Sequence, residues 1–475
     1  MTDAKRVFDY FDDITKIPRG SGNMKGIKSF CTDFALGHDL RSECDDMGNV
    51  IIYKDGTFSL KNAEPVILQG HLDMVCQKIP GSNFDFEKDS IKTFRDGDFI
   101  KADGTTLGAD NAVAVAMIMA ILESDEIEHP PIEAVFTADE EIGMLGAAAL
   151  DFEKLTAKRM INLDSEGMGV LTVSCAGGCD FKTEITFEKE IKSGKRVDIN
   201  ISGLLGGHSG VDINKCRQNA NMIMGRILNH LKSVSDFNVM AIAGGDKGNV
   251  IPSDCSVKLL VSDDELFCRE AEKIFETIKK EICDNEPYFS VSVSADGEGE
   301  FQVIDKKAEE SLIFLLTCAP NGIIEMSAKV ENLVETSLNL GVLKTEENKI
   351  TAIYTLRSNK GSALSALCEK MTKLTSSMGL VCESSGFYAP WEFKENSKLQ
   401  SVCEEIYKKR FGEPVKIEAI HAGLECGIFA SKIKDFDCVS MGPDMYDIHS
   451  VNERLSISST EKLFDYLVEI MKNLK

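Results

Sequence analysis

Residues 66–73 read Val66-Ile67-Leu68-Gln69-Gly70-His71-Leu72-Asp73, a short apolar run followed by two potential metal ligands. An apolar run of this length, bounded by glycine, is typical of a buried strand. Three later runs follow the same plan: Ala134-Val135-Phe136 precedes Asp139-Glu140-Glu141, Met160-Ile161-Asn162-Leu163 precedes Asp164, and Cys438-Val439-Ser440 precedes His449. Buried strands that alternate with helical patterns predict an α/β fold with a mainly parallel sheet flanked by helices.

The pattern changes near Lys195. From there to about Cys382 the expected order is strand, helix, two strands, helix and strand, followed by helix, two strands, helix and strand. This order predicts two ferredoxin-like units in tandem. The α/β character resumes after about Trp391. We therefore expect an α/β domain made of residues 1–190 and 391–475, interrupted by an inserted α+β domain at residues 191–390.

The composition narrows the class of protein. A net charge of −24 argues against nucleic acids and anionic membranes as partners, because the general field repels both. No apolar run approaches the roughly 18 residues of a membrane span, and the first residues do not resemble a signal peptide. The 15 cysteines are scattered and form no CxxC pair, as in a reduced, cytoplasmic protein.

The polar residues after the four runs are expected to converge. In open α/β sheets, ligands bind beyond the carboxyl ends of the strands. His71 and Asp73 are two residues apart and point to the same side of an extended chain, and Asp110 stands before a continuous apolar helix at 111–122. Its carboxylate is placed to bridge two cations about 3.5–4 Å apart, which would hold a shared hydroxide and polarise a carbonyl oxygen. Imidazole with carboxylates suits zinc, with manganese or cobalt as alternatives.

Each residue also has an ordinary explanation when it is taken alone. His71 reads as a strand-end histidine, Asp110 as a helix N-cap, and Asp164 as a turn former. Glu140 and Glu141 read as a solvated acidic pair. Only their joint occurrence at corresponding strand ends favours a dinuclear site.

The chain resembles a known family, the aminoacyl-histidine dipeptidases of peptidase family M20. The resemblance extends from the first helix to the C-terminus and depends on ordered segments: His71-Leu72-Asp73-Met74-Val75, Gly108-Ala109-Asp110-Asn111, Asp139-Glu140-Glu141-Ile142-Gly143, Asn162-Leu163-Asp164-Ser165-Glu166, Gly206-Gly207-His208-Ser209-Gly210, Gly248-Asn249-Val250-Ile251-Pro252, His421-Ala422-Gly423-Leu424-Glu425-Cys426-Gly427 and Asp447-Ile448-His449-Ser450. One departure is Gly167, where the branch usually carries another acid after Glu166.

The resemblance implies a role for each matching residue. One metal would be held by His71, Asp110 and Asp164, and the other by Asp110, Glu141 and His449. Glu140 would be the general base, and Asp73 would orient His71. The domain of residues 1–190 and 391–475 would be catalytic, and His208 of the inserted lid domain would stabilise the oxyanion. Asn249 and Arg357 would hold the substrate, with Arg357 gripping its carboxylate. His208 and Arg357 also read as a turn residue and a surface charge, and His421 and Glu425 are expected to line the site without an assigned role.

These inferences predict a dinuclear metallodipeptidase that hydrolyses unblocked dipeptides, Xaa-His among them, as a monomer or homodimer. An N-acyl amino acid amidohydrolase with the same metals is a second hypothesis. A catalytically inactive binding or scaffold protein of this fold is a third, although a decayed site normally loses some of its ligands.

Overall fold

The computed structural model describes residues 4–330 and 332–475. The chain divides into two compact units, which are described separately. The first unit comprises Met1–Cys175, Phe393–Ala419 and Leu424–Lys475, and the second comprises Ala176–Glu392 and Ile420–Gly423. The first boundary lies before the expected residue 190, because the strand β9 (Gly177–Thr186) pairs along its whole length with β18 (Lys349–Ser358) of the second unit.

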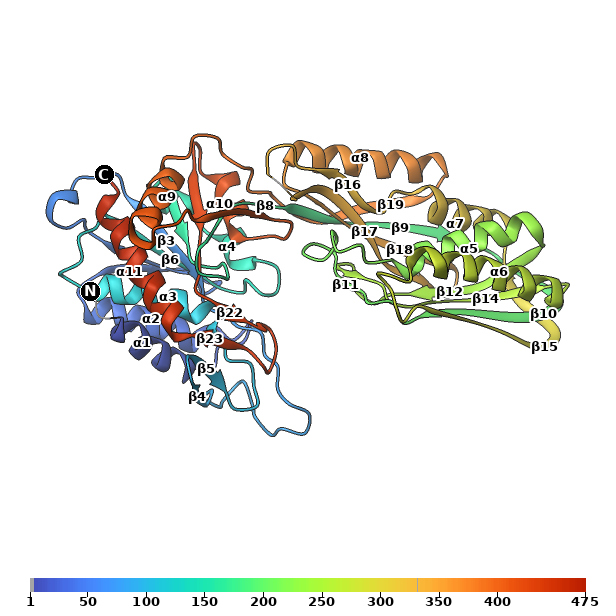
Figure 1. Ribbon diagram of the computed structural model, residues 1–475, viewed down its shortest axis with the longest axis horizontal. Coiled ribbons are helices and arrows are strands. Elements are labelled where there is room, and N and C mark those ends of the chain that lie inside the picture. Colours follow the sequence, from blue (N-terminus) through green and yellow to red (C-terminus); the bar gives the residue numbers. More distant parts are fainter. Residues whose placement is uncertain (1–3, 331) are drawn as a thin grey trace. The chain divides into compact units, whose positions relative to one another are not determined.

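The first unit is built on an eight-stranded mixed sheet (Figure 1). Its strands, in spatial order, are β1 (Arg41–Cys44), β2 (Val50–Lys54), β6 (Ile132–Thr137), β3 (Val66–His71), β7 (Arg159–Asn162), β21 (Asp437–Ser440), β8 (Val170–Cys175) and β20 (Lys416–Ile420). The four expected apolar runs form the central strands β6, β3, β7 and β21, and these are parallel. The parallel character is limited to this centre, because β1, β2 and β8 pair antiparallel.

Helices cover this sheet. The helices of the first unit are α1 (Lys5–Thr15), α2 (Lys25–Gly37), α3 (Ala109–Glu123), α4 (Leu145–Ala149), α9 (Lys398–Phe411), α10 (Glu425–Lys432) and α11 (Ile457–Asn473), with short 3₁₀ turns at Phe58–Leu60 and Phe152–Lys154. The apolar helix α3 packs against α1 and β3, and its residues from Asn111 to Leu122 are buried. A helix that is apolar on all sides needs neighbours on all sides, so α3 lies inside the core.

A small antiparallel sheet carries the last ligand candidate. Its strands are β22 (Met445–Tyr446), β23 (Arg454–Ser456), β5 (Phe99–Ala102) and β4 (Thr93–Asp96). The hairpin between β22 and β23 contains His449. Because β23 pairs with β5, this hairpin is fixed beside the segment that leads into α3.

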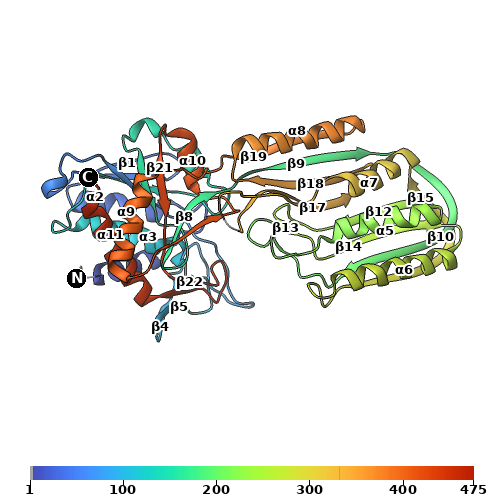
Figure 2. The same ribbon diagram turned by 45° about the horizontal axis from the view of Figure 1, so that its top comes forward.

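The second unit contains a nine-stranded antiparallel sheet, which Figure 2 shows from another side. Its strands, in spatial order, are β15 (Ser290–Ile304), β10 (Lys189–Ser202), β14 (Cys255–Val261), β12 (Phe237–Gly244), β17 (Val334–Thr345), β18, β9 and β19 (Val381–Tyr388), and β16 (Gly322–Met326) pairs with β17. The helices are α5 (Ala220–Val234), α6 (Asp264–Ile282), α7 (Lys306–Cys318) and α8 (Gly361–Ser377). A short ribbon joins β11 (Gly207–His208) to β13 (Val250–Ile251).

Each half of this sheet has ferredoxin-like connectivity. The first half runs β10-α5-β12-β14-α6-β15, and the second combines β9 with α7-β17-β18-α8-β19. The expected tandem order is wrong in one respect, because β9 precedes the whole first half in the chain. The long strands β10 and β15 pair with each other along most of their length. The helix α5 begins at Ala220, where the side chain of Asn219 caps it.

Each unit has its own hydrophobic core, one cluster in the first unit and another in the second. Among the described helices, we find none with the length and apolar character that crossing a membrane requires.

Candidate metal centre

The ligand candidates gather at the carboxyl ends of the four parallel strands of the first unit. His71 is the last residue of β3, Glu140 and Glu141 follow β6, and Asp164 follows β7. His449 reaches the same place from the β22–β23 hairpin. Ligand atoms of His71, Asp110 and Glu141 lie within 4.8 Å of one another.

Asp110 lies between the two histidines. Its Oδ1 is 3.0 Å from Nε2 of His71, and its Oδ2 is 3.1 Å from Nε2 of His449. Asp164 Oδ1 lies 3.3 Å from Nε2 of His71, and Glu141 Oε1 lies 3.1 Å from Nε2 of His449. The cluster thus consists of two groups of three side chains that share one carboxylate.

Asp73 supports both the histidine and the acidic pair. Its Oδ1 lies 3.4 Å from Nδ1 of His71, and its carboxylate accepts hydrogen bonds from the backbone N–H groups of Glu140 (2.9 Å) and Glu141 (3.2 Å) and from the Ser21 hydroxyl (2.8 Å). Burial acts to raise the pKa of Asp73, but these interactions hold it at about 2. Asp73 is therefore an ionised carboxylate beside Nδ1 of His71.

The electrostatics of the cluster favour cations. Burial, together with neighbouring carboxylates, raises the pKa of Glu140 well above its ordinary value and that of Asp164 to about 6. Hydrogen bonds to Asp110 and Glu141 raise the pKa of His449 to about 10. Carboxylates packed this closely repel one another unless positive charge lies between them. This donor set of imidazoles and carboxylates therefore fits a pair of divalent ions.

The sequence did not mark the residues that hold the ligand strands together. Asn111 accepts a hydrogen bond from the His71 N–H through Oδ1 (3.2 Å) and donates one to the Leu163 carbonyl through Nδ2 (2.9 Å). It therefore ties the end of β3 to the end of β7. A side chain at Gly70 would place its Cβ 2.5 Å from Oδ1 of Asn111, so this contact requires glycine.

Glu425, the first residue of α10, is fully buried. Its Oε2 accepts hydrogen bonds from Nε2 of Gln69 (2.5 Å) and Oγ1 of Thr137 (2.6 Å). Burial raises the pKa of Glu425 to about 8. Through these two hydrogen bonds the residue links the carboxyl-terminal parts of β3 and β6.

His208, Asn249 and Arg357 belong to the second unit. Nδ1 of His208 accepts two hydrogen bonds, from the N–H groups of Gly210 (3.1 Å) and Val211 (3.2 Å). Burial lowers the pKa of His208. A neutral imidazole that accepts at Nδ1 carries its proton on Nε2, so this histidine is a fixed Nε2–H donor. The exposed residue Asn249 accepts a hydrogen bond from the Ser209 N–H at its backbone oxygen (2.9 Å).

Arg357 is buried on β18 and donates through Nη1 to the hydroxyl of Tyr388 (2.8 Å). In the described part of the chain its buried Nε has no hydrogen-bond partner. His421 lies in the same unit, with Nε2 2.7 Å from Oγ of Ser337 and Nδ1 3.1 Å from Oδ1 of Asn359. Burial lowers the pKa of His421 to about 3, so it remains neutral.

Comparisons with known proteins agree with this description. The profile of Peptidase family M20/M25/M40 matches residues 67–473. The chain is 33% identical over 472 residues to the cytosol non-specific dipeptidase of Escherichia coli (strain K12). The aligned region covers 98% of this chain and 97% of that protein. The crystal structure of aminoacylhistidine dipeptidase from Vibrio alginolyticus matches with a TM-score of 0.91 and 33% identity, over 100% of this chain and 98% of the other.

A more distant structure shares the fold. The aminopeptidase PepT from Bacillus cereus ATCC 10987 matches with a TM-score of 0.58 and 16% identity, over 100% of this chain and 99% of that chain. The resemblance inferred from the ordered motifs is confirmed, as is the α/β fold with its parallel sheet centre. Because the family profile spans most of the chain and a relative at 33% identity spans nearly all of it, the chain belongs to Peptidase family M20/M25/M40.

Proposed function

We propose that this chain is a two-metal dipeptidase that hydrolyses the peptide bond of unblocked dipeptides, with Xaa-His dipeptides among its substrates. The observation that carries the proposal is the Asp110 carboxylate, whose two oxygens face two different histidines, each accompanied by a further carboxylate. The E. coli and Vibrio relatives, both named as dipeptidases, support the substrate class.

The metal assignment follows the two groups of side chains. One cation would bind His71, Asp110 and Asp164, and the other would bind Asp110, Glu141 and His449. Zinc is the ion that we assign, with manganese or cobalt as substitutes, because all three accept imidazole and carboxylate ligands. When bound, the pair would activate a water molecule and polarise the carbonyl of the scissile bond.

Glu140 is the proposed general base. It is adjacent in sequence to the proposed ligand Glu141, and its raised pKa suits a group that accepts a proton and then gives it up. Glu140 would take the proton of the attacking water and deliver it to the leaving amine. Asp73 would keep His71 in the orientation that binds metal.

The second unit would bind the substrate, as a lid. The Nε2–H of His208 is a neutral, fixed donor, which suits stabilisation of the oxyanion. The unsatisfied Nε of Arg357 supports a role in binding the terminal carboxylate, which an arginine can grip with two parallel hydrogen bonds. Asn249 would contact the substrate from the loop that follows β12.

Substrate specificity separates the hypotheses. We expect the zinc-loaded chain to cleave unblocked dipeptides and to lose this activity on removal of metal with a chelator, with recovery on adding zinc, manganese or cobalt. A panel of Xaa-His and other dipeptides, alongside N-acetyl amino acids, measures this by release of free amines. Efficient cleavage of the acetylated compounds alone would favour the amidohydrolase, and less than one equivalent of bound metal after zinc repletion would favour the scaffold protein.

Arg357→Lys is expected to raise KM more than it lowers kcat. Lysine keeps the charge but cannot form the two parallel hydrogen bonds, and a hydrogen bond to a charged group contributes about 1.5–3 kcal/mol. We therefore expect kcat/KM for dipeptides to fall by about 10–100-fold. The control is Arg196→Lys, which changes an arginine paired with Asp198 on β10. Equal effects of the two substitutions would remove Arg357 from the binding site.

The proposal places the protein in the cytoplasm, as the name of the E. coli relative states for that protein. Its partner is the dipeptide substrate, without nucleic acid or membrane. The state would be a monomer or a homodimer, which sedimentation distinguishes.

A further inference from the structure

Two buried charged residues outside the ligand set hold the backbone around the cluster. Arg19, which follows α1, is 2% exposed. Its Nη1 donates to the carbonyl oxygens of Leu72 (2.9 Å) and Asp73 (2.9 Å), and its Nη2 donates to the carbonyl oxygen of Gly108. His71 is the last residue of β3, and Leu72 and Asp73 follow it directly. The guanidinium therefore joins the carboxyl end of β3 to the segment that leads into Asp110.

Glu453, from the C-terminal part of the sequence, binds the same segment before Asp110. It is 3% exposed, and its Oε2 accepts hydrogen bonds from the N–H groups of Leu107 (2.8 Å) and Gly108 (2.9 Å). Its Oε1 accepts from Ala109 (2.8 Å) and, at 3.4 Å, from Asp110. A carboxylate is favourable at the start of a helix, where backbone N–H groups have no partner within the helix. This one also belongs to the β22–β23 hairpin that carries His449.

Gly108 is the point where the two residues meet. Its carbonyl accepts from Arg19 and its N–H donates to Glu453. Its φ of 69° lies in the left-handed region, and an added Cβ would lie 2.5 Å from Nη2 of Arg19. Glycine is therefore required, and the two charged residues bind the backbone on either side of it.

We propose that Arg19 and Glu453 are positioning residues that set the spacing of His71, Asp110 and His449, and that metal affinity depends on them. This inference rests on the proposed function, because it takes these three residues as ligands. A buried charged side chain is costly to maintain. Here the charged groups of Arg19 and Glu453 both form hydrogen bonds with main-chain atoms of segments that carry ligands. Such hydrogen bonds fix the separation between the segments that carry the ligands.

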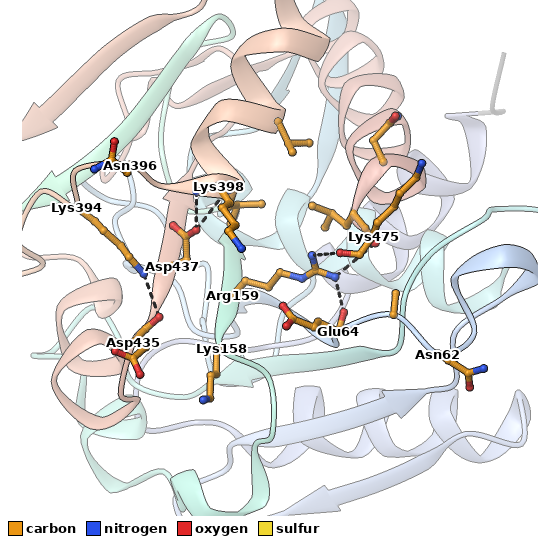
Figure 3. Close-up of a pocket in the computed structure, with 15 residues that line it drawn as sticks. Asn62, Glu64, Lys158, Arg159, Lys394, Asn396, Lys398, Asp435, Asp437 and Lys475 are labelled. Atoms are coloured by element: carbon orange, nitrogen blue, oxygen red, sulfur yellow. Dashed lines mark hydrogen bonds between the residues drawn. The ribbon is translucent and has the colours of Figure 1, made fainter.

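The same sheet offers matched controls at the amino ends of its strands. Glu133 on β6 is 5% exposed and accepts hydrogen bonds from the N–H groups of Thr156 (2.9 Å) and Ala157 (3.1 Å). Arg159 on β7 donates to main-chain carbonyl oxygens of Glu64, Pro65, Leu474 and Lys475, in the pocket of about 750 Å³ that Figure 3 shows. Both make the same kind of contact, away from the ligands.

The experiment compares Glu453→Gln and Arg19→Lys with Glu133→Gln and Arg159→Lys. Zinc affinity is measured by competition with a chromophoric chelator, bound zinc by elemental analysis, and the Tm of the metal-free protein by circular dichroism. We expect the first two variants to bind zinc about 10–100-fold more weakly, as changes next to metal ligands do. The two controls should keep the wild-type affinity, even where their metal-free Tm falls by as much.

Two results would overturn the inference. One is wild-type zinc affinity in Glu453→Gln and Arg19→Lys, and the other is equal weakening in the controls, which would indicate general destabilisation. Glu453→Asp, which keeps the charge on a shorter side chain, is expected to restore part of the affinity, and it serves if Glu453→Gln does not fold. A wild-type chain that binds fewer than two equivalents of zinc would instead contradict the proposed function.

Discussion

Asp110→Ala is expected to lose both bound cations and, with them, dipeptide hydrolysis. The two carboxylate oxygens of Asp110 face different histidines, at 3.0 Å and 3.1 Å, so a single substitution removes a ligand from each proposed metal. Changes beside metal ligands already cost about 10–100-fold. Loss of a ligand that serves two ions should therefore exceed 100-fold in turnover and reduce bound zinc from two equivalents to less than one.

Elemental analysis of zinc-repleted protein and single-turnover assays on a dipeptide measure these two losses together. Asp103→Ala is the matched control, because Asp103 is an exposed aspartate in the segment before the same helix. It should keep two equivalents of zinc and the wild-type rate. If Asp110→Ala retained both metals, the shared carboxylate would not be a bridge, and the assignment of Asp110 as a ligand of both cations would be wrong.

The central strands were predictable because the residues of each one form a recognisable apolar run. Val66 to Leu68, and the three runs like it, are short and mainly apolar segments, which are typical of a strand buried on both faces. The strand β9 was not predicted. It begins with Gly177 and Gly178, and its buried positions alternate with charged ones, so it contains no apolar run. Without β9 the order of the two ferredoxin-like halves could not be inferred.

The ligand candidates were predictable from residue type and position, because histidines and carboxylates at successive strand ends must converge. Their supports were not. Glu453 and Arg19 bind main-chain atoms of segments far away in sequence. Because every residue has the same main-chain atoms, such hydrogen bonds cannot be inferred from residue types. In sequence Glu453 resembles any surface acid between two polar neighbours, and only the structure shows that it is buried.

The candidate residues of the second unit show the same limit. The resemblance to a family implied a donor role for His208, but the tautomer that such a role needs depends on hydrogen bonds from the N–H groups of Gly210 and Val211. Those bonds follow from a local turn, which the segment Gly206-Gly207-His208 suggests but does not specify. His421, which had no predicted role, is held neutral between Ser337 and Asn359.

Glu140→Ala is expected to separate metal binding from catalysis. Among the described residues, the side chain of Glu140 takes no part in the contacts that join His71, Asp110, Asp164, Glu141 and His449. The variant should therefore bind two equivalents of zinc with the wild-type affinity. Removal of a general base typically costs about 10²–10⁴-fold in rate. We expect a loss of this size in kcat, with little change in KM, because the substrate contacts proposed for Arg357 and Asn249 are untouched.

The comparison with Glu140→Gln and Glu140→Asp tests the reason for that loss. Glutamine keeps the size of the side chain without a site for the proton, so its rate should fall as far as that of the alanine variant. Aspartate keeps the carboxylate on a shorter chain and should recover part of the rate. A glutamine variant with near wild-type kcat would show that the proton leaves the attacking water by another route, whereas loss of zinc from any of the three would make Glu140 a ligand instead of a base. Because Asp110→Ala is expected to lose metal and rate together and Glu140→Ala to lose rate alone, the pair distinguishes a carboxylate that holds the ions from one that moves the proton.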